Sequence, residues 1–349
     1  MTTAVETPLI APSRFNAAAG LLPGVGLCLA VAATAWCYQA AERALLGKVW
    51  LESLVLAIVI GVAIRTFSPL PPRCLSGVAF SGKRFLEVAI VLLGASLNAQ
   101  LLTAVSPLLL LGVVGLVFAS IGFSVLVGRA LGLTRAMATL VACGNAICGN
   151  SAIAAVAPVI DAKPDDVAAA IGFTAVFGVA GVLLLPLLGS MLSLSPTSYG
   201  AFAGLTVYAV PQVIAAASPA GAQAVQMGAL VKLVRVMTLG PVCLLLALTR
   251  GGRGASSAKA PQLLPWFILG FFGMAILKIC GFIPQAAVGP AAQAATMLTV
   301  VSMAALGLGV DVRVIARAGP RIIATVLISL LGLGAMSLGL LTLLQMRAG

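Results

Sequence analysis

Residues 142–160 read ACGNAICGNSAIAAVAPVI and place two Gly-Asn steps and a proline inside an apolar chain. Glycine weakens a helix, so we expect the helix to unwind here and to restart near residue 151. In lipid, the backbone groups freed by such a break persist only where protein or a water-filled cavity satisfies them. The stretch therefore predicts a binding site inside a membrane-embedded helix. Its candidate residues are Gly144, Asn145, Gly149, Asn150 and Ser151.

The restarted half-helix predicts the sign of the ligand. Its N-terminal end offers unpaired N–H groups and a positive dipole, which favour an anion. The carbonyl groups that end the upstream half-helix favour a cation instead. The alternative interpretation is close helix packing through small residues, without a site.

The composition is that of an integral membrane protein. The 349 residues are 61% hydrophobic and only 8% charged, whereas globular domains carry roughly 25% charged residues. No long polar segment separates a soluble domain, so we interpret residues 1–349 as one membrane unit. Its two candidate halves are residues 50–190 and 199–346, preceded by an extra helix at 20–39.

Eleven apolar segments have about the length that a membrane-crossing helix needs. An all-α polytopic fold of ten or eleven transmembrane helices follows. The first segment is interpreted as an uncleaved helix, although Ala33-Thr34-Ala35 resembles a signal cleavage site. The predicted segments are 20–39, 50–67, 84–102, 107–128, 134–160, 166–190, 199–218, 223–249, 263–281, 290–312 and 319–346.

The net charge of +12 comes from cations that lie mostly between apolar segments. Most of them fall in alternate loops, for example at 65–84, 250–259 and 313–321. The positive-inside rule then predicts a cytoplasmic N-terminus and an external C-terminus, in the bacterial cytoplasmic membrane. Lipid is thus the expected partner, and a nucleic-acid partner is not expected.

Residues 93–107 and 306–320 have a similar spacing of glycine, polar and proline residues, with Asn98 and Asp311 at matching positions. The two segments run in opposite directions, as inverted repeats require. A second scheme pairs spans two to six with spans seven to eleven. The sequence leaves both pairings open.

Residues 204–217, GLTVYAVPQVIAAA, predict a second break. Pro211 removes one helical hydrogen bond and obstructs another. The polar candidates around it are Thr206, Tyr208 and Gln212, with Thr206 considered for ion coupling. The alternative is a merely kinked helix with Tyr208 at the membrane interface.

Lys232 and Arg235 lie three residues apart within a predicted span and so share one helical face. A charge at mid-bilayer costs at least about 2.5–3.5 kcal/mol on the insertion scale. We therefore expect both cations to face the protein interior and to balance an anionic substrate or Asp311. The alternative is a shifted boundary that leaves them near the interface.

Asp311 follows a glycine-rich segment, GLGVD, and is a candidate for cation coordination or proton transfer. The alternative is a solvated helix end beside Arg313. The chain has no His, no metal-ligand cluster and no phosphate-binding loop, so we expect no enzyme activity, cofactor or metal.

The 142–160 motif closely resembles the signature of the YeiH (UPF0324) family of bacterial inner-membrane proteins, a family of proposed sulfate exporters. Residues 231–242, 265–271 and 304–312 resemble further segments of that family. Asn145 and Asn150 depart from the Thr and Ala of many members, and Thr206-Val207-Tyr208 replaces Ser-Ile-His. This second departure puts a proton-transfer role at that position in doubt.

The resemblance implies a fold similar to that of the bile-acid and sodium–proton transporter superfamily. Such folds have inverted five-helix repeats, broken helices that cross at the midplane, and a core domain that moves against a panel domain.

We therefore predict a secondary transporter that moves a small anion, such as sulfate or a related sulfur oxyanion, by alternating access. The alternatives are an organic-acid symporter coupled to sodium or protons, a cation/proton antiporter, and a non-transporting receptor or assembly factor. The substrate, the direction and a homodimeric state are left open.

Overall fold

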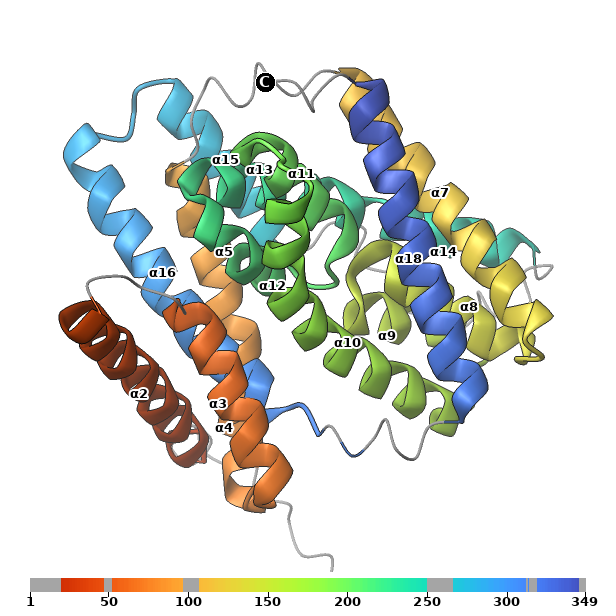
Figure 1. Ribbon diagram of the computed structural model, residues 1–349, viewed down its shortest axis with the longest axis horizontal. Helices are drawn as coiled ribbons and strands as arrows, with labels where there is room; N and C mark the ends of the chain where they lie inside the picture. Colours follow the sequence, from red (N-terminus) through yellow and green to blue (C-terminus); the bar gives the residue numbers. More distant parts are fainter. Residues whose placement is uncertain are drawn as a thin grey trace, which may run out of the picture.

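The computed structural model describes residues 20–46, 52–96, 107–249, 266–311, 313 and 319–344. Within these ranges the regular secondary structure is helical throughout (Figure 1). Six of the described helices are long and apolar enough to cross a membrane, and four shorter apolar helices accompany them. The predicted all-α polytopic fold is confirmed.

Seven of the described helical elements pack into one bundle, here called the first bundle, which lies on the left of Figure 1. It combines the N-terminal helices with two helices from late in the chain. Glycines allow close contacts in it: a Cβ at Gly61 would lie 2.7 Å from the carbonyl oxygen of Ala304. Its elements are α2 (Leu22–Leu46), α3 (Ser53–Phe67), α4 (Pro72–Phe80), η1 (Ser81–Phe85), α5 (Leu86–Ala95), α15 (Trp266–Ile279) and α16 (Gln285–Leu308).

The remaining helices form a second bundle, in which the final helix α18 packs beside α7 (Figure 1). Its elements are α7 (Pro107–Ala130), α8 (Arg135–Cys143), η2 (Gly144–Cys148), α9 (Asn150–Val159), α10 (Pro164–Met191), α11 (Pro196–Thr206), α12 (Val210–Ala217), η3 (Ser218–Ala220), α13 (Ala222–Met237), α14 (Leu239–Thr249) and α18 (Pro320–Leu343).

The two bundles meet mainly where α3 and α16 approach α10 and α12. One hydrogen bond between them joins Gln226 Nε2 of α13 to the carbonyl oxygen of Ser96, at 2.8 Å. Each bundle draws helices from both candidate halves, 50–190 and 199–346. The bundles are therefore discontinuous in sequence, and neither coincides with one half.

Each of the eleven predicted apolar segments contains helix in its described part. The third differs at its start, because helix runs from Pro72 through a π-helical turn to Ala95. Lys83 and Arg84, expected in a loop, lie on that turn instead. The second half of the 93–107 segment, from 97 to 106, and the loop at 250–261 lie outside the described residues.

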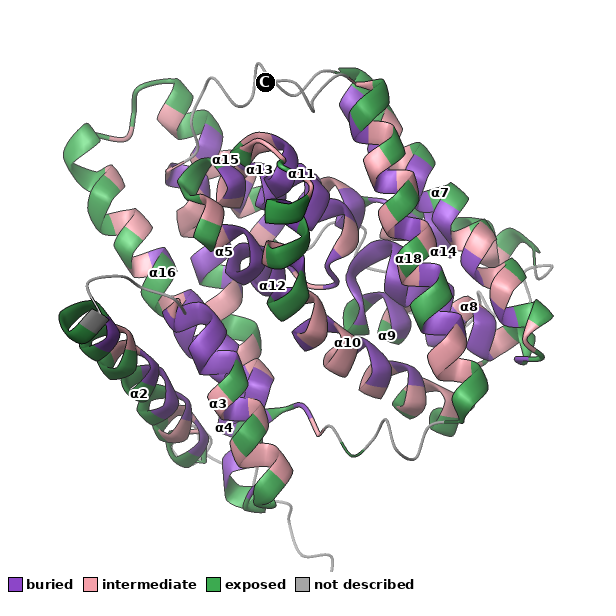
Figure 2. Cartoon of the chain, in the orientation of Figure 1, coloured by how far each residue is buried: buried purple, intermediate pink, exposed green. Residues whose placement is uncertain are grey.

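Burial is concentrated where the broken helices of the second bundle lie (Figure 2). All residues from Tyr199 to Leu205 on α11 and from Val210 to Ala217 on α12 are buried or nearly so. In contrast, α2, α7 and α18 keep exposed faces rich in leucine, as lipid-facing helices do. The second break, and the first break up to Gly149, therefore lie inside the protein, whereas α9 begins with two exposed residues, Asn150 and Ser151.

Candidate functional site at two broken helices

The first break lies in the stretch 142–160, as predicted. Helix α8 continues into the π-helical turn η2, and the helix is then interrupted at Gly149, with φ 68° and ψ −125°. Only glycine adopts this backbone region without strain. Helix α9 begins directly afterwards at Asn150, one residue before the predicted restart.

The second break separates α11 from α12. Val207 and Ala209 are extended, with ψ of 150° and 149°. Pro211 lies in the first turn of α12, where a proline removes no helical hydrogen bond. Gln212 Oε1 accepts the backbone N–H of Ala209 at 3.2 Å and so caps α12. The break is thus a full interruption and not the alternative kink.

The two breaks cross one another. A Cβ built on Gly149 would lie 3.2 Å from the Cβ of Tyr208. The Tyr208 hydroxyl donates to Asn145 Oδ1 at 2.8 Å, which joins the second break to the first. Both side chains are buried, so this bond is held away from bulk solvent. The structure therefore brings together two motifs that lie about sixty residues apart in the sequence.

Lys232 enters this crossing from α13 and is fully buried. Its Nζ donates to the carbonyl oxygen of Ile147 at 2.6 Å and to that of Val207 at 2.7 Å. One carbonyl belongs to each broken helix. The ammonium group therefore bridges the two breaks.

Arg235 lies beside Lys232 and is also fully buried. Its Nη2 donates to the carbonyls of Asn145, at 2.8 Å, and Ala146, at 2.5 Å, and its Nε donates to Ala146 at 2.9 Å. Its Nη1 donates to Gly204, at 3.0 Å, and to Leu205. Because a guanidinium group has five N–H donors, every donor of Arg235 has a carbonyl partner here.

These contacts explain how two buried cations are tolerated. Each half-helix that enters the crossing ends with unpaired carbonyls and about half a negative charge. Lys232 and Arg235 supply hydrogen-bond donors and positive charge at both ends. The predicted interior position of the cations is thus observed, with main-chain oxygens as their partners.

Asp311, one of the two predicted partners of these cations beside an anionic substrate, does not pair with either of them in the described structure. Among the described residues, the structure contains one salt bridge, between Arg84 and Glu87 at 2.9 Å. Asp311 follows the end of α16, and its Oδ1 accepts the backbone N–H of Arg313 at 3.0 Å. Its carboxylate is therefore stabilised at a helix end, as in the alternative interpretation. Asp311 does not meet the cations because α16 belongs to the first bundle, whereas Lys232 and Arg235 belong to the second.

The remaining predicted residues lie near the crossing with different partners. Thr206 donates to the carbonyl of Phe202 at 2.7 Å, within its own helix. Asn150 and Ser151 form the exposed first turn of α9. Gln212 packs against α10, where a Cβ on Gly178 would lie 2.4 Å from its Nε2.

Sequence reasoning missed Thr174 of α10, whose hydroxyl donates to Asn150 Oδ1. A lone threonine in an apolar span leaves no distinctive signal. The carbonyl acceptors of the crossing were also unassigned, because every residue carries a carbonyl and only the fold selects those that are used.

Two groups of donors at the crossing have no side-chain partner. Gly149 offers no side chain to cap α9, so helix geometry leaves the N–H groups of Asn150 and Ser151 without intrahelical acceptors. Asn145 is 3% exposed, and its Nδ2 donates to no group in the described part of the chain. A buried donor of this kind favours a ligand with acceptor atoms.

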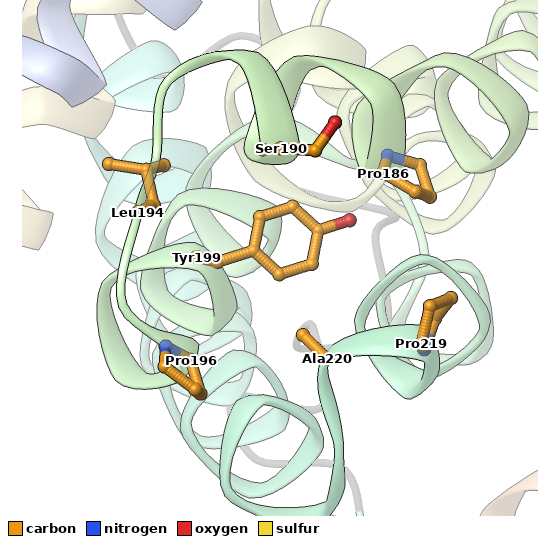
Figure 3. Close-up of a pocket in the computed structure, with 8 residues that line it drawn as sticks. Pro186, Ser190, Leu194, Pro196, Tyr199, Pro219 and Ala220 are labelled. Carbon is orange, nitrogen blue, oxygen red and sulfur yellow. The ribbon is translucent and has the colours of Figure 1, made fainter.

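A separate cavity of about 280 Å³ lies between the end of α10, the start of α11 and η3 (Figure 3). Pro186, Pro196 and Pro219 line it, and the Tyr199 ring projects between them. The Tyr199 hydroxyl donates to the carbonyl of Ala216 at 2.6 Å. None of its lining residues belongs to the crossing, so this cavity is a distinct feature.

Comparison with known proteins identifies relatives over nearly the whole chain. The family model described as conserved hypothetical protein 698 matches residues 23–326. A UPF0324 membrane protein of Agrobacterium fabrum is 50% identical and covers 93% of this chain and 94% of its own length. A UPF0324 membrane protein of Brucella melitensis is 49% identical, and the alignment covers 97% of this chain and 94% of that protein. A UPF0324 membrane protein of Bacillus cereus is 34% identical, and the alignment covers 90% of this chain and 93% of that protein.

Among solved structures, the sodium proton antiporter MjNhaP1 from Methanocaldococcus jannaschii is similar to this chain at 12% identity. The alignment covers 92% of this chain and 99% of that one, with a TM-score of 0.29. A likeness this low carries no argument about the chain.

Proposed function

Because this chain belongs to the UPF0324 family of membrane proteins, and two broken helices cross inside it, we propose that it is a secondary transporter of small anions. Broken helices at membrane depth are the usual places where transporters bind substrates and ions. The proposed location is the bacterial cytoplasmic membrane.

The charge of the crossing carries the proposal. Two half-helix C-terminal ends contribute about one negative charge in total, against two unit positive charges from Lys232 and Arg235. No carboxylate forms a salt bridge with either cation in the described part of the chain. The crossing therefore keeps a net positive charge, which attracts anions and repels cations.

The uncapped N-terminus of α9 and Asn145 Nδ2 supply the proposed binding donors. Helix N-termini bind oxyanions because their N–H groups and dipole point at the ligand. Lys232 and Arg235 would compensate the negative charge of the anion without contacting it, because their donors already bind the main-chain carbonyl groups. Tyr208 and Thr174 then orient the two asparagines.

Two fixed positive charges match a dianion best, so we place the substrate among sulfate and related sulfur oxyanions. The N-terminal ends of α9 and α12 add about half a positive charge each, so the crossing carries about two positive charges in total. A bound dianion would neutralise this charge and lower the cost of moving the site within a low-dielectric membrane. The resemblance to a family of proposed sulfate exporters supports the same class. Movement of the second bundle against the first would carry the site between the two membrane faces.

A cation/proton antiporter fits the crossing less well, because its carbonyl groups are already occupied by protein cations. An ion-coupled organic-acid symporter is separated from our proposal by its cation dependence. A receptor or assembly factor would bind the anion without flux.

Uptake of radiolabelled sulfate into proteoliposomes tests the proposal. Asn145→Asp changes little volume, but it replaces the unpaired donor with a negative charge. We expect at least about a tenfold loss of uptake, equivalent to roughly 1.4 kcal/mol in the binding free energy.

The matched control is Gln285→Glu, the same type of change at the exposed start of α16. It should transport like the wild type. Equal uptake by the wild type and Asn145→Asp would contradict the site. Failure of the wild type to transport sulfate, sulfite or thiosulfate would contradict the substrate class.

A further inference from the structure

The groups that contact Lys232 Nζ are of the kind that binds a monovalent cation. Its two hydrogen-bond partners are main-chain carbonyl oxygens at 2.6 and 2.7 Å, one from each broken helix. In transporters that use coupling ions, unwound carbonyls and half-helix C-terminal ends are the groups that coordinate the ion. The side chain is fully buried, so its charge is not shared with bulk solvent.

We propose that the Lys232 ammonium group permanently occupies the position of a coupling cation, so that transport by this chain needs no sodium. The ammonium group supplies the same unit charge and meets the same hard oxygen ligands as a bound alkali cation. The consequence for transport rests on the proposed anion-transport function, whereas the latent cation site does not.

The neighbouring residues are consistent with a latent site for one cation. Arg235 directs its donors to Asn145, Ala146, Gly204 and Leu205, and so leaves the carbonyls of Ile147 and Val207 to Lys232. Removing the lysine side chain therefore exposes two converging oxygens and a space of ammonium size. The arrangement predicts that ammonium and potassium, which are similar in size to the lost group, fill it better than a large organic cation.

Thermal unfolding of purified Lys232→Ala tests the latent site. Its apparent Tm should rise by at least about 2 °C when N-methylglucamine chloride is replaced by ammonium or potassium chloride at equal concentration. The wild type and Lys83→Ala, which truncates an exposed lysine on η1, should show no such difference. A folded Lys232→Ala protein whose Tm is the same in all three salts would overturn the proposal.

Measurements on the wild type keep the proposal testable if Lys232→Ala does not fold. Specific stabilisation of the wild type by sodium over potassium would contradict an occupied cation site. Where sulfate uptake is detected, its rate should be equal in sodium-containing and sodium-free buffers, and an absolute sodium requirement would overturn the inference. Absence of uptake would instead count against the proposed function and leave the Tm result to decide the cation site.

Discussion

Lys232 and Arg235 show how single side chains decide whether this chain can place two interrupted helices inside a membrane. Each charge is costly to bury, and removing one partner of a buried charged group typically costs about 3–5 kcal/mol. Here the partners are carbonyls that the breaks themselves leave unpaired. The cations and the breaks therefore stabilise one another.

Gly149 is the residue at which the first break is least tolerant of change. Gly149→Ala places a Cβ in a left-handed conformation and 3.2 Å from the Cβ of Tyr208. Strain of this kind costs on the order of 1–3 kcal/mol. We expect a clear loss of thermal stability in detergent and a loss of anion binding.

Gly181→Ala on α10 is the matched control, because a Cβ there meets nothing within 4 Å. Its stability should stay within about 1 kcal/mol of the wild type. Equal stability of the two variants would show that the Gly149 conformation is not required.

At the scale of elements, α13 carries both cations of the crossing and packs against α11. It packs along α11 so closely that a Cβ on Gly200 would lie 2.2 Å from the carbonyl oxygen of Ala224. Small residues permit this approach between membrane helices. The close packing fixes the height at which Lys232 and Arg235 reach the crossing.

The variant Gly200→Ala tests this coupling between packing and site. The added methyl group must separate α11 from α13, because a backbone atom opposes it. We expect lower thermal stability together with weaker protection of the Lys232–Arg235 segment in hydrogen exchange. Gly115→Ala on α7, where a Cβ meets open space, should change neither quantity.

At the scale of the whole molecule, two bundles share few contacts, and the crossing lies wholly in the second. Such an arrangement suits a rigid-body movement of one bundle against the other. The hydrogen bond from Gln226 to the Ser96 carbonyl joins the two bundles.

Cross-linking across this contact tests whether the movement is needed. Cysteines at Ser96 and Gln226, joined by a reducible bifunctional reagent, should abolish anion flux, and reduction should restore it. The background protein should lack the exposed Cys37 and Cys280, and each single cysteine variant serves as the control. Undiminished flux in the cross-linked protein would contradict alternating access by movement of the bundles.

The predicted orientation has its own test in Cys280, which is exposed just beyond the end of α15. A cytoplasmic N-terminus places this residue outside. In a background that lacks Cys37, which is also exposed, a membrane-impermeant maleimide should then label the protein in intact cells. Adding Cys280→Ser should remove that label. Labelling that needs broken membranes would reverse the orientation.

Much of the fold follows from local sequence patterns. Apolar length predicts the helices, and Gly149 and Pro211 mark breaks because backbone preference is a property of the residue itself. The start of the third segment was misplaced because Lys83 and Arg84 indicated a loop, whereas the helix from Pro72 continues through them.

The sequence by itself determined an all-helical membrane protein with two polar breaks and two cations on one helical face. Only the tertiary structure decided that Tyr208 at one break meets Asn145 at the other, and that the cations bind main-chain carbonyls and not Asp311. The physical reason is the range of the interactions. Helix propensity and hydropathy act within one segment and can be evaluated from its residues alone. Main-chain carbonyls are the same at every residue, so the ones that accept hydrogen bonds from the cations are determined only when distant helices pack together.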